Sequence, residues 1–294
     1  MGDANAPPFP APVKGWHADT YPGIDPSRPE LSLKGKSVIV SGGGGTIGFA
    51  TVKALATAGV RLVGIVGRTQ KTLDETSSKL KGQYPGTKIV SATGDISSFS
   101  SLESAFKQIR QQAGNPVDIL VHNAGHLASP GPIATTDPKE WWTSFEVNIL
   151  GAFNSIRAFL PVAPTNATIV NMSTAVAHVP TTMISGLSAY SSSKLAALRI
   201  FDFLQDEHPE MHIVNMHPGI IMSDLNSKHG AATPMDTPEL AASFVVWLCS
   251  PEAKFLKGKL AWANWDVDDL KAKAAEIQNS PSLTMALTGW SSLS

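Results

Sequence analysis

Residues 37–48, which read SVIVSGGGGTIG, decide the fold of this chain. The apolar run 37–40 predicts a buried strand, and it leads directly into a glycine-rich turn and an apolar helix. Glycines let the backbone turn tightly and approach a pyrophosphate, and the free N–H groups of a helix N-terminus attract negative charge. A glycine cluster alone usually marks only a turn, but a strand before it and a helix after it are the context of a nucleotide-binding loop. The predicted nucleotide contacts in this loop are Gly42, Gly45, Thr46, Ile47 and Gly48.

The same alternation of strand and helix continues along the chain. Further β-branched and apolar runs predict strands at 62–66, 88–90, 118–121, 168–170, 212–215 and 259–262. Helical patterns fall at about 47–58, 70–81, 100–112, 138–159, 188–206, 237–249 and 266–278. Parallel strands need right-handed helical crossovers. We therefore predict an α/β fold, a Rossmann-like doubly wound parallel sheet of seven strands, in a single domain over residues 33–265.

Residues 1–32 differ from this body in composition. Seven of the 21 prolines lie here, and proline fixes φ and removes a backbone donor, so we expect an extended arm. Trp16, Tyr21 and Ile24 can pin the arm to the body or to a neighbouring subunit, and a partly disordered leader is the alternative. Residues 266–294 are expected to form a C-terminal helix and tail.

Charge and composition exclude several classes of partner. The 23 basic and 24 acidic side chains give a net charge of -1, which argues against a nucleic-acid footprint and a polybasic membrane patch. Cys249 is the only cysteine, so no internal disulfide forms, and no apolar run approaches the roughly 20 residues of a spanning helix. No segment has the pattern of a secretory signal. We expect a cytoplasmic protein with a small-molecule substrate.

The end of the second strand should choose the nucleotide. An acid there would hold a ribose 2′-hydroxyl, whereas an arginine suits a 2′-phosphate. The sequence places Arg68 at this point and no acid, which favours NADP(H) over NAD(H). The alternative is an ordinary surface arginine at a strand end.

The pair Tyr190 and Lys194 is a second source of chemistry. The spacing i, i+4 at the start of a predicted helix places the phenol and the ammonium on one face. A tyrosine with a pKa near 10 is a poor acid–base group at neutral pH, and a neighbouring cation should lower that pKa. A tyrosine and a lysine at this spacing usually lie on a solvated helix face. The pair indicates a catalytic site here only because the same chain also contains the glycine loop.

With both features together, the sequence resembles the short-chain dehydrogenase/reductase family over about residues 33–265. GDI at 94–96 resembles the segment that contacts the adenine, and HNAG at 122–125 resembles the motif ending the fourth strand. FEVN at 145–148, IVNMST at 169–174 and HPGIIMS at 217–223 resemble the segments with the catalytic asparagine, the catalytic serine and the nicotinamide contacts. The arm and the ending resemble a fungal subgroup that includes enzymes of secondary metabolism.

The resemblance implies a site and a reaction. Tyr190 would exchange a proton with a carbonyl or alcohol oxygen as hydride moves, Lys194 would lower the phenol pKa and bind the ribose, and Asn148 would hold a relay water. The resemblance further implies a homodimer or homotetramer that interconverts a carbonyl and an alcohol on a small organic molecule. The implied NADP(H) contacts beyond the glycine loop and Arg68 are Asp95, Ile96, Asn123, Ala124, Gly125, Tyr190, Lys194, Pro218, Gly219, Ile221 and Ser223.

Two positions depart from the family pattern. In its T-G-x-x-x-G-x-G loop the middle glycine is Thr46 here, which would crowd the diphosphate unless Gly45 takes over the close approach. The family serine lies 13 residues before the tyrosine, where this chain has Ala177 and an inserted stretch near 180–185 follows. Alignment on the fifth strand instead gives Thr174 as the catalytic hydroxyl, with Ser173 as the alternative.

These departures keep two other functions open. The same fold can serve a non-redox step, as a dehydratase, isomerase or cyclase, or it can serve a nucleotide sensor or scaffold without catalysis. We expect no metal site, because the pairs His122/His126 and His208/His212 lack a convincing third ligand. The mixed segment 223–237 is expected to act as a lid over the pocket.

Overall fold

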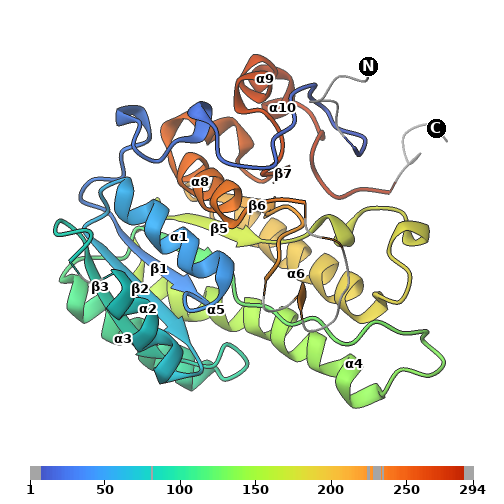
Figure 1. Ribbon diagram of the computed structural model, residues 1–294, viewed down its shortest axis with the longest axis horizontal. Helices are drawn as coiled ribbons and strands as arrows, with labels where there is room; N and C mark the ends of the chain where they lie inside the picture. The colour runs from blue at the N-terminus through green and yellow to red at the C-terminus, as the bar shows by residue number, and fades with distance from the viewer. Residues whose placement is uncertain (1–7, 81, 224–225, 228–232, 234, 288–294) are drawn as a thin grey trace.

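The computed structural model describes residues 8–80, 82–223, 226–227, 233 and 235–287. Its centre is a sheet of seven parallel strands in the order β3-β2-β1-β4-β5-β6-β7 (Figure 1). The strands are β1 Ser37–Ser41, β2 Leu62–Gly67, β3 Lys88–Thr93, β4 Ile119–His122, β5 Thr168–Met172, β6 His212–His217 and β7 Leu260–Trp262. The predicted doubly wound fold is confirmed.

Helices cover both faces of the sheet. Their bounds are α1 Thr46–Thr57, α2 Gln70–Leu80, α3 Phe99–Ala113, α4 Pro138–Phe145, α5 Gly151–Phe159, α6 Ser188–Glu207, α8 Pro238–Cys249, α9 Val267–Ala272 and α10 Ala274–Gln278. Side chains of α1, α2 and α8 share one buried apolar cluster, and those of α3, α5 and α6 share the other. Within β1, Val38 and Val40 face the first cluster and Ile39 the second. Burial on both faces explains why consecutive residues of this strand are apolar.

Two predicted helices are interrupted. The segment 138–159 contains a π-helical turn over Glu146–Leu150, between α4 and α5. Single π turns inside α-helices occur often at functional sites, and this one carries Asn148. The segment 266–278 divides into α9 and α10 at Lys273, whose φ and ψ of -103° and 9° leave the helical region.

The described part of the arm is pinned to the body. Trp16 forms an antiparallel bridge with Trp265, and the ring of His17 contacts Asp266 at 2.8 Å. The hydroxyl of Tyr21 accepts a hydrogen bond from the N–H of Val267 at 2.9 Å. Figure 1 shows the arm crossing the molecule to lie beside the C-terminal helices. Of the two alternatives, residues 8–32 therefore follow the pinned one, while the division into 1–32, 33–265 and 266–294 as domains stays a prediction.

The C-terminal segments are described only in part. Leu283 and Met285 pack against the core, while the end of the tail beyond residue 287 lies outside the described residues. Most of the expected lid, residues 223–237, also lies outside them, apart from residues 223, 226–227, 233 and 235–237. None of the described helices combines the length and the apolar character needed to cross a membrane.

Candidate active site

A cavity of about 600 Å³ runs along the carboxyl ends of the parallel strands. In doubly wound sheets the ligand binds at this edge, at the point where the connections that follow two neighbouring strands run in opposite directions. Here that point lies between β1 and β4, which are neighbours in the sheet. Every predicted site residue except Asn148 lines this cavity: Gly42, Gly45, Thr46, Ile47, Gly48, Arg68, Asp95, Ile96, Asn123, Ala124, Gly125, Ser173, Thr174, Tyr190, Lys194, Pro218, Gly219, Ile221 and Ser223.

The glycines of the loop have different structural reasons. Gly42 has a φ of +67°, which favours glycine, and a Cβ there would lie 2.9 Å from Nδ2 of Asn123. A Cβ on Gly48 would collide with the carbonyl oxygen of Gly42. At Gly45 the same atom would meet only that oxygen, at 3.6 Å, and the residue borders the cavity just before α1. The space beside Gly45 and the helix N-terminus fits a diphosphate, as a nucleotide cofactor requires.

Hydrogen bonds fix the loop against the end of β4. The hydroxyl of Ser41 accepts from the N–H groups of Asn123 and Ala124, at 3.0 and 3.1 Å. The amide of Asn123 donates to the carbonyl oxygens of Ser41 and Gly42, at 3.0 and 3.2 Å. Asn123 therefore holds the floor of the cavity in place through the backbone of the glycine loop.

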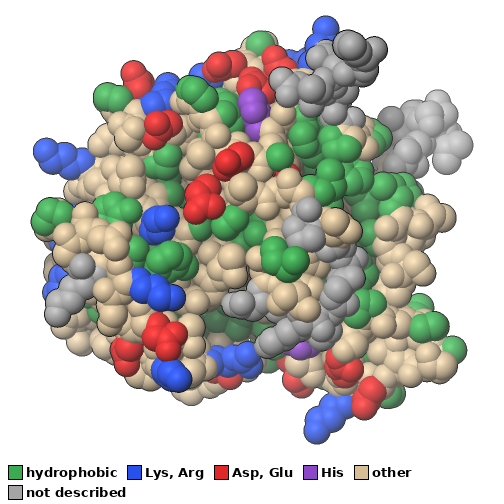
Figure 2. Space-filling view, in the orientation of Figure 1, with side chains coloured by type: hydrophobic (Ala, Val, Ile, Leu, Met, Phe, Trp, Pro, Cys, Tyr) green, Lys and Arg blue, Asp and Glu red, His purple; other side chains and the backbone are tan. Residues whose placement is uncertain are grey.

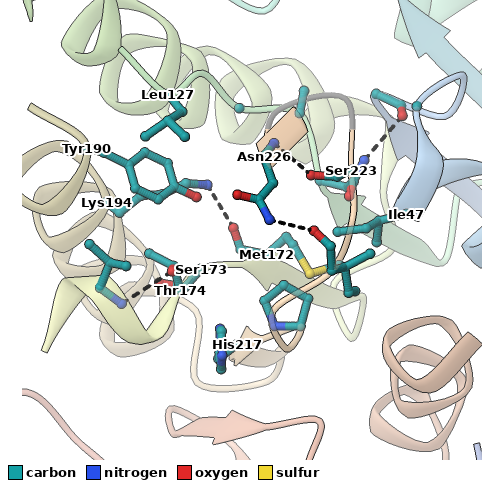
Figure 3. Close-up of a pocket in the computed structure, with 18 of the residues that line it drawn as sticks. Ile47, Leu127, Met172, Ser173, Thr174, Tyr190, Lys194, His217, Ser223 and Asn226 are labelled. Atoms are coloured by element: carbon teal, nitrogen blue, oxygen red, sulfur yellow. Dashed lines mark hydrogen bonds between the residues drawn. The ribbon is translucent and has the colours of Figure 1, made fainter. Parts of the chain in front are cut away.

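Tyr190, Lys194 and Thr174 come together in the middle of the cavity (Figure 3). Nζ of Lys194 donates to the carbonyl oxygen of Met172 at 2.9 Å and lies 6.0 Å from the centre of the Tyr190 ring. A hydrogen bond joins Tyr190 to the side chain of Thr174. The hydroxyl of Ser173, in contrast, is buried without a hydrogen-bond partner among the described residues. The geometry thus brings Thr174, rather than Ser173, to the phenol.

Burial dominates the acid–base behaviour of the pair. It raises the pKa of Tyr190 to about 12, although the hydrogen bond with Thr174 lowers it. Burial also lowers the pKa of Lys194 to about 8. The expected lowering of the phenol pKa is therefore absent from this structure, because desolvation of the phenolate outweighs the hydrogen bond with Thr174. At neutral pH the phenol holds its proton, which is the form that can protonate a carbonyl oxygen.

Asn148 lies behind the cavity wall in the π turn. Its Oδ1 accepts from the N–H of His126, and its Nδ2 donates to the carbonyl oxygen of the same residue, both at 2.8 Å. Nδ2 also donates to the hydroxyl of Ser193 at 2.9 Å. Gly125 is the spacer, since a Cβ there would lie 3.2 Å from Nζ of Lys194 and 3.3 Å from Oδ1 of Asn148. The role of Asn148 in holding a relay water stays a prediction.

The nucleotide end of the cavity carries the charged residues. Arg68 follows β2 at the cavity edge with its side chain exposed. Asp95 follows β3, and its Oδ1 accepts from the N–H and the hydroxyl of Ser97, at 2.9 and 2.7 Å. Arg68 is thus free of any carboxylate at its own strand end, as an arginine that binds a 2′-phosphate would need.

Several residues that line the cavity were not predicted from the sequence. The most notable are Phe9, from the arm, and Trp262, at the end of β7. His217 stands inside the predicted HPG segment but was given no role there. The inserted stretch near 180–185 contributes Met183 and Ile184 to the lining. A proline-rich composition gave no signal that Phe9 reaches the cavity.

Other reactive groups do not form a second site. Among the described residues, no three His, Cys, Asp or Glu side chains come together as metal ligands. Cys249 is buried in α8, and burial raises the pKa of its thiol to about 12, which keeps it protonated.

The fold and the site together define a nucleotide-dependent α/β protein with a tyrosine–lysine pair, and comparison with known proteins gives its family. A family model described as short chain dehydrogenase matches residues 36–233, more than half of the chain. The chain belongs to the short-chain dehydrogenase family. Similar proteins include the short chain dehydrogenase mpl6 of Monascus purpureus, 34% identical over 94% of this chain and 96% of its own. The short chain dehydrogenase/reductase nsrO of Aspergillus novofumigatus is 31% identical over 89% and 91%.

Solved structures agree on the fold. A 3-ketoacyl-ACP reductase from Sinorhizobium meliloti is 25% identical with a TM-score of 0.69, over 77% of this chain and 96% of its own. L-sorbose reductase from Gluconobacter frateurii, complexed with NADPH and L-sorbose, gives a TM-score of 0.70 at 20% identity, over 81% and 98%. A 3-ketoacyl-ACP reductase from Brucella melitensis, complexed with NADH, gives 0.69 at 22% identity, over 79% and 98%. Both dinucleotides thus occur on this fold.

Proposed function

We propose that this protein is an NADP(H)-dependent oxidoreductase that interconverts a carbonyl and an alcohol on a small organic molecule, in the secondary metabolism of a fungus. The observation that carries the proposal is the meeting of Tyr190, Thr174 and Lys194 in the cavity that the glycine loop also lines. The Monascus and Aspergillus relatives support the fungal setting. The lone cysteine, without a disulfide partner, supports a cytoplasmic location.

The residues divide the work as follows. When bound, the nicotinamide supplies or accepts a hydride. The phenol of Tyr190 donates its proton to the substrate oxygen in reduction and recovers it in oxidation. The hydroxyl of Thr174, hydrogen-bonded to the phenol, orients the same oxygen. Lys194 places a cation behind the phenol and stabilises the phenolate that forms when the proton leaves.

The 2′-phosphate preference rests on Arg68. A guanidinium binds phosphate through charge-assisted hydrogen bonds, and no acid stands at the end of β2 to favour a free ribose hydroxyl. The remaining contacts of the cofactor would come from the glycine loop, from Asn123 and from Pro218 and Gly219.

The Tyr190→Phe substitution tests the catalytic role. It removes the proton donor and keeps the ring, so we expect NADPH binding to stay within about twofold while turnover of a ketone falls by at least about a hundredfold. Binding is measured by NADPH fluorescence, and turnover by loss of absorbance of the reduced nicotinamide. Undiminished turnover in this variant would refute the acid–base assignment.

The non-redox alternative makes a different stoichiometric prediction. Thr46 replaces the middle glycine of the family loop at the first position of α1. This departure is the reason to consider a dehydratase, isomerase or cyclase as the alternative function. Product formed without net change in NADPH would favour that alternative. One NADPH consumed for each product molecule favours the oxidoreductase.

A second copy of this chain is the proposed partner. Large apolar side chains are exposed on α4, on the π turn, on α5 and on α6, and burying them would stabilise a dimer. They are Trp142, Leu150, Phe153, Leu195 and Phe203. Light scattering on purified protein should give twice or four times the mass of one chain, and Phe153→Asp should shift it towards the monomer.

A further inference from the structure

The end of the cavity nearest β7 is built from aromatic rings. Phe9 meets Trp262 edge-on, with ring centres 5.9 Å apart and an angle of 60° between planes. His217 meets the same indole at 4.7 Å and 73°. All three line the cavity, and His217 and Trp262 are partners in the register of β6 and β7.

This aromatic wall stands on the substrate side of the phenol. Thr174 follows β5, next to the central strand β4, and the glycine loop and Arg68 follow β1 and β2 on one side of it. β6 and β7 lie on the opposite side. A dinucleotide that lies against the loops after β1 and β2 and reaches Pro218 and Gly219 with its nicotinamide leaves the end of the cavity nearest β7 for the other reactant.

The wall is held rigidly in place. Trp262 stacks on Trp265 at 5.8 Å with planes 3° apart, and its Nε1 donates to Nε2 of His178 at 3.2 Å. Trp16 packs against Phe9 and Trp262 at 6.1 and 6.0 Å, so the arm holds Phe9 over the indole. A surface arranged before binding loses little conformational entropy when a ligand arrives.

The chemistry of this end is neutral. Among the described residues, the charged side chains that line the cavity are Arg68, Asp95 and Lys194, and none of them stands at the β7 end. Burial lowers the pKa of His217 to about 3, so its ring carries no charge at neutral pH, and its Nδ1 has no hydrogen-bond partner among the described residues. Val179, Met183 and Ile184 complete the lining with aliphatic groups. Figure 2 shows apolar side chains gathered on the right-hand side of the molecule. Met183, which lines the cavity, is itself 53% exposed.

We propose that Phe9, His217 and Trp262 form a subsite for an uncharged aromatic ring of the carbonyl substrate, with Phe9 supplied by the N-terminal arm. Aromatic rings prefer edge-to-face and offset contacts, which this wall offers, and none of the described residues at this end provides a cation for a carboxylate or phosphate. The inference rests on the proposed function, because it names the substrate class of the same cavity.

Two diketones test the subsite in the full-length protein with NADPH. Phenanthrenequinone is planar and aromatic, whereas diacetyl is small and aliphatic. Phe9→Ala should lower kcat/KM for phenanthrenequinone about tenfold, because it removes one aromatic contact, and should leave diacetyl within about twofold. Phe9→Leu keeps the apolar surface without the ring. Its kcat/KM for phenanthrenequinone should lie between the values of the unsubstituted protein and of Phe9→Ala.

The matched control is Phe99→Ala. Phe99 is also partly buried, but it begins α3 at the far edge of the sheet and does not line the cavity. Removal of the Phe99 ring should change kcat/KM for phenanthrenequinone and for diacetyl by less than about twofold. Equal losses for both diketones in Phe9→Ala, or no loss for either, would overturn the subsite.

A binding measurement separates this proposal from the redox proposal. Naphthol carries an aromatic ring and cannot be reduced by NADPH, and its affinity is measured by calorimetry in the presence of NADP⁺. If naphthol binds and Phe9→Ala weakens it about tenfold, the subsite stands even where no diketone is turned over. If naphthol does not bind, or binds equally well to Phe9→Ala, the subsite is wrong even where turnover is normal.

Discussion

A single side chain, Arg68, carries the proposed preference between the two dinucleotides. It is exposed at the cavity edge where a 2′-phosphate would lie if the adenine ribose packs after β2. Its neighbours in the loop are uncharged, so no second cation in Val66–Thr69 can replace it.

Arg68→Ala should raise the Kd for NADPH by about 10- to 100-fold, because hydrogen bonds to charged groups contribute about 1.5–3 kcal/mol. The Kd for NADH should change by less than about threefold and serves as the internal control, since NADH lacks the phosphate. Fluorescence titration measures both. A parallel loss of both affinities would mean that Arg68 supports the fold of the site rather than the phosphate.

At the residue scale, the sequence predicts many of the residues that line the cavity and favours Thr174 over Ser173 as the hydroxyl beside the phenol. Tyr190 and Lys194 were readable because their spacing survives in one helix. Thr174 and Ser173 were both open because the insertion near 180–185 breaks the count back from the tyrosine. The backbone turn that starts at Thr174 resolves the pair geometrically, since it brings Thr174 to Tyr190 and buries the hydroxyl of Ser173.

At the scale of elements, the glycine loop has one position that serves the fold and one that serves the ligand. Gly48 is packed against the Gly42 carbonyl, whereas Gly45 borders open space. The contrast gives a matched pair of alanine substitutions within four residues.

Gly48→Ala should destabilise the protein by about 1–3 kcal/mol, because its methyl group overlaps the Gly42 carbonyl. Gly45→Ala should leave the free energy of unfolding within about 1 kcal/mol and weaken NADPH binding at least about tenfold, because its methyl group fills the space for the diphosphate. Urea unfolding and NADPH titration measure the two quantities. Unchanged NADPH affinity in Gly45→Ala would contradict a close approach of the diphosphate to Gly45. The diphosphate would then have to pass nearer to Thr46.

The π turn at Glu146–Leu150 could not be predicted from the sequence. What stabilises the turn is tertiary: Asn148 bonds to the backbone of His126 and to Ser193. Such partners are distant in sequence and carry no periodic signal.

At the scale of the whole molecule, three buried histidines should set its acid stability. Burial lowers the pKa values of His122, His212 and His217 from 6.5 to about 3. Each is neutral in the folded state and takes up a proton on unfolding below pH 6.5. The unfolded chain then binds more protons than the folded one, so stability falls as the pH falls from about 6 towards 3.

With three such groups, the free energy of unfolding should fall by up to about 4 kcal/mol per pH unit near pH 5, since each proton contributes about 1.4 kcal/mol. Urea unfolding at a series of pH values measures this slope. His212→Gln should reduce the slope by about a third and His208→Gln, at a half-exposed position, should not. A slope below about 1 kcal/mol per pH unit would show that the histidines are not neutral in the folded protein.

The overall topology was predictable, whereas the place of the arm was not. Strand runs, helical crossovers and the handedness rule leave few arrangements for a chain of this pattern. The arm, however, is fixed by contacts between residues far apart in sequence, such as His17 with Asn264, 247 positions away, and Lys14 with Asp269, 255 positions away. Proline content indicated an extended conformation there, but nothing local indicated the surface on which it lies.

Those contacts have a consequence for synthesis on the ribosome. The arm is translated before its seat around Asn264, Trp265 and Asp266, with an interval on the order of tens of seconds between them. Through that interval the nascent segment with Phe9 and Trp16 has no docking surface. The aromatic end of the cavity can therefore form only after residues 262–266 have been synthesised.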